Sequence, residues 1–444
     1  MCACGSEAGP DLTLAVRVPT SIDSQRLLAS VATVTLRAER DGRVLAQAQA
    51  EASASRVNLG GVPFGPRTEF ILEGLAISGD VIARGRSCPI NFERGGPPVP
   101  LYFSPTNFFA DTVGPPAVAR ADAVALPLAD GTVLLVGGAR PDGTSLDSAA
   151  LYGTPTATFA DAPGQHLSVA RTAAALAVVP AQGAVVVGGL DAMGRPLDNA
   201  DVFDFTTRTF SLLQGQQLGA RVGHRVVALA DTDQRLLVVG GSDPSTALIN
   251  LRSEGAKIEA GPPLPDARRE PAVVVAVGIP LVFGGYNPAG LPTRSIYAVE
   301  TPLPTSSPSL LYPRAEATAT LLDDGAILVV GGVFDPIGQR MCDAELYNPI
   351  SQTTTCLPLG TPRRGHTATA LDQGRVLVIG GLGDADGQPL ASVELYVPAS
   401  GFVSERSLGK PRRGHVAVPL CDRTVLVAGG DADGRPSAEI YAPR

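Results

Sequence analysis

An arginine recurs along most of this chain, 15–19 residues before each of seven glycine pairs. A guanidinium forms two parallel hydrogen bonds with a carboxylate or a sulfate, so arginines gathered on one face of a fold would bind an anion. Aspartates follow several of the glycine pairs and would border the same face. The candidate binding residues are Arg171, Arg221, Arg314, Arg364, Arg413, Asp191, Asp243, Asp384 and Asp431. The alternative is structural: a buried arginine must be paired with a carboxylate, and its charge is then unavailable to a ligand.

The other residues that could do chemistry do not form a complete catalytic or metal-binding motif. The sequence has no Ser-His-Asp arrangement, phosphate-binding loop or CxxC pair. Asp384-Ala-Asp-Gly387 and Asp431-Ala-Asp-Gly434 resemble the start of a calcium loop, but no glutamate follows at the required spacing. Asp-Gly is first of all a turn former. We therefore predict no catalytic residue, no metal and no cofactor.

The six cysteines bear on the cellular compartment. The start, Met1-Cys-Ala-Cys4-Gly-Ser, resembles the tail of a bacterial lipobox with Cys4 as the lipidated residue, although the basic and apolar parts of a signal peptide are missing. A lipid at Cys4 would tether the protein to a membrane. The alternative is a disordered N-terminal segment with two incidental thiols.

Two further cysteines flank one expected hairpin. The midpoint of Cys342 and Cys356 falls in its turn, so the two side chains should face each other near disulfide distance. A disulfide there implies an oxidising compartment. The alternative is a pair of buried free thiols. Cys88 and Cys421 are a second candidate pair, and a bridge between them would link two domains.

The composition describes a globular, turn-rich chain. Of 444 residues, 50 are Gly and 39 are Pro, and 44% are hydrophobic, while the net charge is only −8. The acidic balance argues against nucleic acid as a partner. No apolar run reaches the roughly 18 residues that a membrane-spanning helix needs.

The glycine pairs mark an internal repeat. Their first glycines lie at 137, 188, 240, 284, 331, 380 and 429, which is a spacing of 44–52 residues. Each repeat has a strand of small residues, a Val-rich strand ending in the glycine pair, a strand ending in an aromatic residue, and a last strand that often carries Phe. Seven four-stranded sheets with this period are typical of a closed ring rather than of independent sandwiches.

The repeat resembles the kelch repeat over residues 104–444. The resemblance rests on Arg364-Gly365-His366 and Arg413-Gly414-His415, on the double glycine, and on Glu345-Leu346-Tyr347 and Glu394-Leu395-Tyr396. It implies an all-β fold with a seven-bladed propeller. Kelch repeats usually carry Trp in the fourth strand, where this chain has Phe.

Some propellers of this repeat class resemble galactose oxidase, a copper enzyme. Such a site needs two His and two Tyr, one Tyr being cross-linked to Cys. This chain has four His, at 166, 224, 366 and 415, and three of them occupy one repeat position. We therefore expect these three to be packing residues, while His366 and His415 in adjacent blades leave a two-His metal site open.

The last repeat lacks its fourth strand, and an earlier segment matches it. Residues 104–111 and 154–161 are identical at five of eight positions, and the second segment is a fourth strand. We therefore predict that residues 104–111 complete the blade containing Gly429-Gly430, since an open ring would expose a strand edge.

The segment before the repeats forms a separate domain. Residues 11–103 alternate apolar and polar positions in six or seven short strands, with Asp41-Gly42 as a hairpin turn. This segment resembles transthyretin-like or carboxypeptidase-regulatory-like β-sandwiches. Residues 1–10 are a short N-terminal stub.

These observations predict a non-enzymatic binding or scaffold protein of the bacterial cell envelope, in the periplasm or at the cell surface. Its propeller face would recognise a protein or glycan ligand. We expect a monomer with no nucleic-acid partner, in contact with a membrane only through a lipid anchor. The alternative is a galactose-oxidase-like copper oxidase or another carbohydrate-active enzyme.

Overall fold

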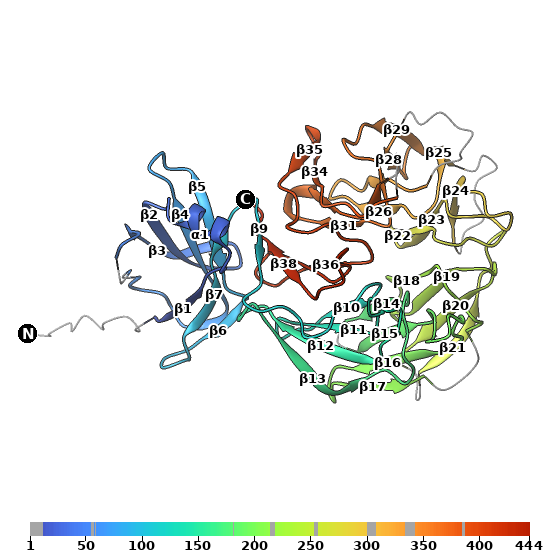
Figure 1. Ribbon diagram of the computed structural model, residues 1–444, viewed down its shortest axis with the longest axis horizontal. Helices are drawn as coiled ribbons and strands as arrows, with labels where there is room; N and C mark the ends of the chain where they lie inside the picture. The colour runs from blue at the N-terminus through green and yellow to red at the C-terminus, as the bar shows by residue number, and fades with distance from the viewer. Residues whose placement is uncertain are drawn as a thin grey trace, which may run out of the picture.

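The chain folds into two β units, a small N-terminal unit (blue in Figure 1) and a ring of sheets (teal through red). The computed structural model describes residues 12–54, 57, 59–180, 182–213, 218–252, 256–299, 308–333, 342–383 and 387–444. The N-terminal stub, with Cys4 and its predicted lipid, and the candidate Asp384 lie outside these residues.

The ring is a β-propeller of seven four-stranded antiparallel sheets, as the glycine spacing predicts. The first blade consists of β10 (Val124–Pro127), β11 (Thr132–Val136), β12 (Ser148–Gly153) and β13 (Thr158–His166). The second consists of β14 (Ala175–Val179), β15 (Gly183–Val187), β16 (Ala200–Asp204) and β17 (Thr209–Leu212). The third consists of β18 (His224–Ala228), β19 (Leu236–Gly240), β20 (Thr246–Asn250) and β21 (Lys257–Gly261).

The remaining blades repeat the same order. The fourth consists of β22 (Ala272–Ala276), β23 (Ile279–Phe283), β24 (Thr293–Ala298) and β25 (Ser309–Arg314). The fifth consists of β26 (Thr318–Leu321), β27 (Ile327–Val330), β28 (Ala344–Asn348) and β29 (Thr353–Leu357). The sixth consists of β31 (Thr367–Ala370), β32 (Val376–Ile379), β34 (Val393–Val397) and β35 (Gly401–Glu405), and carries the 3-10 turn η1 (Asp372–Gly374) and the short pair β30 (Arg363–Arg364) and β33 (Leu382–Gly383).

The seventh blade closes the ring with a strand from before the first. It consists of β36 (Val416–Pro419), β37 (Val425–Ala428), β38 (Ala438–Tyr441) and β9 (Phe109–Asp111). The closing strand is shorter than the predicted 104–111, because β8 (Ser104–Pro105) pairs with the N-terminal unit instead. The ring centroids of Phe109 and Tyr441 are 4.9 Å apart, so an aromatic contact accompanies the closure.

The second strand of each blade is buried on both faces, because blades pack on either side of it. In β15 and β32, every described residue from Ala184 to Val187 and from Val376 to Ile379 is fully buried. The glycine pair after the strand has positive φ, and its first member touches the next blade: a Cβ on Gly137 would lie 2.7 Å from the carbonyl oxygen of Arg171. No other residue fits there.

The N-terminal unit consists of two sheets around one core. The larger contains β2 (Thr33–Arg40), β3 (Arg43–Glu51), β4 (Gly65–Leu75), β5 (Val81–Arg86), β6 (Ile90–Phe92) and β8; the smaller is the parallel pair β1 (Leu14–Arg17) and β7 (Val99–Tyr102). Phe70 and Leu101 come from different sheets and share the core. Asp41-Gly42 forms the β2–β3 turn. The helix α1 (Ile22–Leu28) was not predicted, and Ser24 is its one buried residue.

Both proposed disulfides are present. Cys342–Cys356 links the ends of one hairpin, and Cys88–Cys421 joins the N-terminal unit to the seventh blade across 333 residues of sequence. Tyr102 adds a hydrogen bond from its hydroxyl to the Asp111 carbonyl, at 2.6 Å. Among the described helices, none is long and apolar enough to cross a membrane.

The role of β9 can be isolated with two truncations, one starting at residue 104 and one at residue 113, each carrying Cys421→Ser. Both lack the N-terminal unit, but only the shorter one exposes the edge of β38. We expect the shorter protein to be less stable by at least about 3–5 kcal/mol, the usual cost of losing one buried Phe. Urea unfolding measures the difference. Equal stabilities would show that β9 does not hold the ring closed.

Candidate functional site

Seven backbone positions with left-handed geometry surround the propeller axis. One lies just before the first strand of each blade, and their φ angles are 51–67°. The seven residues are Asp122, Ala173, Gly223, Glu270, Glu316, Gly365 and Gly414. Hydrogen bonds link neighbouring members, such as Glu316 N to Glu270 O at 3.0 Å and Asp122 N to Gly414 O at 2.7 Å. Left-handed φ is costly for residues other than glycine, so four of them in one ring mark a candidate site.

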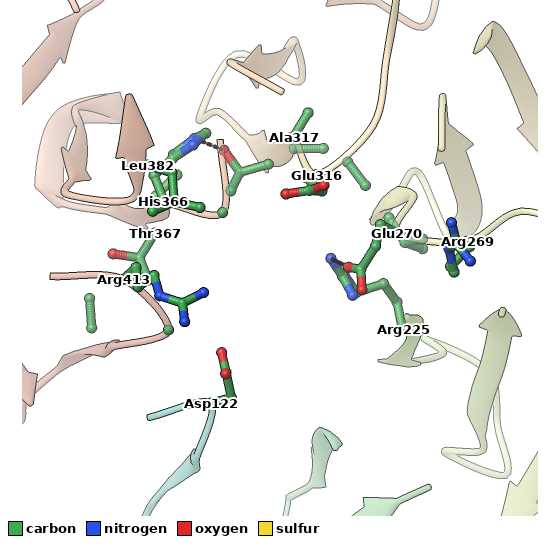
Figure 2. A pocket seen from close by; sticks show the side chains of 18 of the residues that line it. Asp122, Arg225, Arg269, Glu270, Glu316, Ala317, His366, Thr367, Leu382 and Arg413 are labelled. Atoms are coloured by element: carbon green, nitrogen blue, oxygen red, sulfur yellow. Dashed lines mark hydrogen bonds and ion pairs between the residues drawn. The ribbon is translucent and has the colours of Figure 1, made fainter. Parts of the chain in front are cut away.

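The ring of seven left-handed positions surrounds a cavity of about 810 Å³ on the propeller axis. Small side chains of the innermost strands, such as Ala272, Ala319 and Ala417, form part of its wall and leave the space open. Figure 2 shows charged side chains converging on this space from several blades. The polar lining includes Asp122, Arg225, Arg269, Glu270, Tyr286, Glu316, His366, Thr367 and Arg413.

Two of the three carboxylates in the cavity have close partners. The Arg225 guanidinium lies 2.9 Å from Glu270, and both groups are about one third exposed. The Tyr286 hydroxyl donates a hydrogen bond of 2.7 Å to Glu316, which also lies 3.8 Å from Arg364. Burial and the Glu316 carboxylate raise the pKa of Tyr286, so it stays protonated at neutral pH. Arg269 stacks over the Tyr286 ring at 5.4 Å.

The third carboxylate, Asp122, is in a different environment. It lies against Gly414, where a Cβ would collide with it. Asp122 is exposed toward the cavity, but partial desolvation by the protein around it raises its pKa; the Arg413 charge opposes this effect, and the Glu270 charge adds to it. Asp122 and Glu270 line the same cavity. A carboxyl with a raised pKa in the same cavity as a carboxylate paired with arginine is an arrangement suited to acid–base chemistry.

The predicted arginines divide into two groups. Arg171, Arg221 and Arg314 are buried and do not line the cavity. Arg171 binds Asp201 at 2.7 Å and the Gly188 carbonyl at 3.1 Å. Counterparts of these three occur in the other blades: Arg120, Arg268, Arg363 and Arg412.

The two remaining candidates follow buried arginines directly. Arg364 and Arg413 come one residue after Arg363 and Arg412, and both project from the core. In an Arg-Arg pair, the sequence alone does not show which member is buried. Of the predicted arginines, only Arg413 lines the cavity.

The predicted aspartates have local roles in the described structure. Asp191 binds Arg195 at 2.7 Å, Asp243 accepts a hydrogen bond from the Ser245 backbone, and Asp431 is buried against Arg412. None of these three lines the cavity. They hold loop turns or a buried arginine, so they are not part of this candidate site.

The sequence analysis did not identify three acidic residues of the cavity, which stand at a repeat position where other repeats have glycine. Asp122, Glu270 and Glu316 each stand two residues after a repeat arginine, where other repeats have Gly365 or Gly414. Aligning the repeats would have shown acidic residues at a glycine position. Tyr286 follows a glycine pair directly, and nothing in its local sequence marks it.

The three repeat histidines are buried and hydrogen-bonded. His224 Nε2 lies 3.1 Å from the Val187 carbonyl, and His366 and His415 contact threonine hydroxyls at 3.0 and 2.9 Å. Burial lowers the pKa of His224 to about 4 and those of His366 and His415 to about 3. They are neutral at physiological pH. His166 is exposed, 3.8 Å from Asp147.

These contacts do not fit a copper site of the galactose-oxidase type. Across the described ranges, no three His, Cys, Asp or Glu side chains come together to hold a metal. The four described cysteines are in disulfides, so none is free to cross-link a tyrosine. The cavity's donors are carboxylates, most of which are engaged by arginine or tyrosine.

Comparison with known proteins supports the fold. No protein-family model and no curated protein matches the sequence. Among solved structures, the chain is similar to a fungal alcohol oxidase of the AA5 family in complex with copper. The TM-score is 0.57 at 18% identity, and the match covers 74% of this chain and 75% of the oxidase.

This similarity corrects the expectation of a non-enzymatic binding or scaffold protein. The similar structure is an alcohol oxidase, so the finding is closer to the alternative of a galactose-oxidase-like copper oxidase than to a scaffold protein. At 18% identity, the likeness shows the fold alone.

Substitutions at Arg363 and Arg364 should separate the two arginine groups. Arg363→Ala removes a fully buried guanidinium that binds Glu394 at 2.9 Å, and it leaves that carboxylate unpaired. We expect a loss of about 3–5 kcal/mol. Arg364→Ala removes a partly exposed ion pair worth at most about 1 kcal/mol. Denaturant unfolding of both variants checks this, and similar losses would contradict the assignment.

Proposed function

We propose that this protein is an enzyme that hydrolyses glycosidic bonds of a carbohydrate in the axial cavity, without copper. The observation that carries the proposal is that Asp122 and Glu270 line the same cavity, where Arg225 holds Glu270 at 2.9 Å. Glycoside hydrolysis uses one carboxylic acid and one carboxylate on either side of the scissile bond. The similarity to an alcohol oxidase supports an enzymatic role for a propeller of this shape.

Each carboxyl group has a distinct role in this proposal. Asp122 donates its proton to the leaving oxygen of the glycosidic bond, which breaks the bond to the sugar carbon. Glu270 accepts a proton from the attacking water, whose oxygen forms the new bond. Arg225 orients Glu270 and acts as a positioning residue. Tyr286 and Glu316, hydrogen-bonded at 2.7 Å, border the same space and offer contacts to sugar hydroxyls.

An extracytoplasmic location is part of the proposal. Two disulfides support it, because such bonds persist in oxidising compartments. We propose the cell envelope, with a lipid on Cys4 as the tether. Mass spectrometry of protein from its native membrane fraction would test the lipid.

The test is hydrolysis of a panel of neutral and acidic oligosaccharides, with release of reducing ends as the readout. We expect Asp122→Asn and Glu270→Gln each to lower kcat by about 100-fold or more. Asparagine also tolerates left-handed φ, so Asp122→Asn should stay folded. Asp142→Asn, in an exposed turn outside the cavity, is the matched control.

Metal dependence separates this proposal from the oxidase alternative. Activity should survive a chelator, and hydrogen peroxide should not form when copper and galactose are added. Copper-dependent peroxide production would contradict the proposal, as would full activity in both carboxylate variants.

The pH profile should report Asp122. As the acid it must be protonated, so kcat/KM should fall as pH rises through its pKa, which lies above the usual value of about 4. The groups acting on Asp122 are Arg413, which lowers this pKa, and Glu270, which raises it. Arg413→Gln should therefore move the alkaline limb to higher pH. A limb that stays in place would assign it to another group.

A further inference from the structure

We propose that the substrate is an acidic sugar whose carboxylate binds Arg413, in a subsite beside Gly365; this inference rests on the proposed function of the same cavity. Arg413 lies directly before Gly414 in the ring and lines the cavity. Figure 2 shows its guanidinium in the space between Asp122 and Thr367.

Among the residues that the structure describes, the Arg413 guanidinium has no bonded partner, unlike the other arginines around the cavity. Arg225 is paired with Glu270, Arg364 with Glu316, and Arg269 stacks on Tyr286. The Arg413 guanidinium makes no hydrogen bond or ion pair with any residue that the structure describes, and its side chain is exposed. Its positive charge acts on Asp122 through space and lowers the pKa of that carboxyl. Its hydrogen-bond donors are therefore available to a ligand.

The ring of seven left-handed positions leaves open space next to Arg413. A Cβ built on Gly365 meets no heavy atom within 4 Å, and Gly365 is exposed. The equivalent positions in three other blades carry Asp122, Glu270 and Glu316, whose side chains fill that part of the ring. A sugar ring can therefore occupy the sixth-blade side of the cavity, with an acidic group reaching Arg413 and a glycosidic oxygen near Asp122.

The chemistry of Arg413 favours a planar oxyanion. The planar guanidinium matches a carboxylate with two parallel hydrogen bonds, and such charge-assisted bonds are about twice as strong as neutral ones. A sulfate offers similar oxygens, so the shared chemistry is an oxyanion on a sugar. We commit to the carboxylate of a uronic acid, and the sulfate is an arm of the test.

The test is calorimetric titration of the full chain with uronate disaccharides, their methyl esters and a sulfated disaccharide. We expect at least one uronate to bind about 10-fold or more tightly than its ester, the usual effect of a charge-assisted pair. Arg413→Gln should reduce uronate affinity to that of the ester and leave the ester unchanged. Arg413→Lys, which keeps the charge but loses the planar fork, should give an intermediate affinity.

Two further variants locate the subsite. Gly365→Asn puts a side chain into the open part of the ring at a left-handed position that asparagine tolerates, and it should weaken binding of acid and ester alike. Arg435→Gln removes an exposed arginine from a loop of the same blade as Arg413 and should change neither. Thermal melting confirms that each variant is folded.

Several outcomes would overturn the inference. These are equal binding of uronate and ester, no binding of any uronate, binding unaffected by Arg413→Gln or Gly365→Asn, or tight binding of the sulfated sugar alone. Hydrolysis of a neutral sugar that depends on Asp122, with no preference for uronates, would overturn the acidic substrate and keep the proposed function. Uronate binding that depends on Arg413, with no hydrolysis, would keep the subsite and overturn the proposed function.

Discussion

The propeller depends on one buried arginine per blade. In six of the seven blades, this guanidinium donates to the carbonyl of the first glycine in its own blade's pair, at 2.7–3.1 Å. In all seven, its backbone carbonyl accepts a hydrogen bond from the second glycine of the preceding blade, at 2.7–3.0 Å. The last of these bonds runs from Gly430 to Arg120 and so joins the two ends of the ring. Burying a charge is costly unless it is well bonded, so five of these arginines also pair with a carboxylate, while Arg120 and Arg221 bond serine and backbone oxygens instead.

This arrangement also explains where chemistry can occur. Because the repeat arginines are committed to the fold, their charges do not reach the axis. The position two residues later does reach it, and its left-handed geometry is held by the ring of backbone hydrogen bonds. Glycine there leaves space, as at Gly365, whereas Asp122 and Glu270 place a carboxyl group in the cavity. The seven-bladed scaffold thus carries an asymmetric site. The residue type differs between blades at these left-handed positions, which the packing of the blades does not constrain.

The cavity chemistry favours acid–base catalysis over metal chemistry. Its donors are carboxylates, a tyrosine and guanidiniums, while the buried histidines are bonded to threonines or a backbone carbonyl. The fold is similar to that of a copper oxidase, but a fold supplies only the scaffold, and the residues that line the cavity supply the chemistry. The Cys88–Cys421 bridge fixes the N-terminal unit against the blade that closes this ring.

The sequence by itself determined the architecture, because each repeat can be identified from short segments of the sequence. The glycine pairs gave the number of blades, the match of 104–111 with a fourth strand gave the closure, and the spacing of Cys342 and Cys356 gave one disulfide. The tertiary structure alone decided the site. The buried member of two Arg-Arg pairs binds a carboxylate about 30 residues away, as Arg363 binds Glu394 and Arg412 binds Glu439. Asp122 and Glu270 line one cavity only because ring closure brings residues from distant blades to one axis, and no local pattern encodes that arrangement.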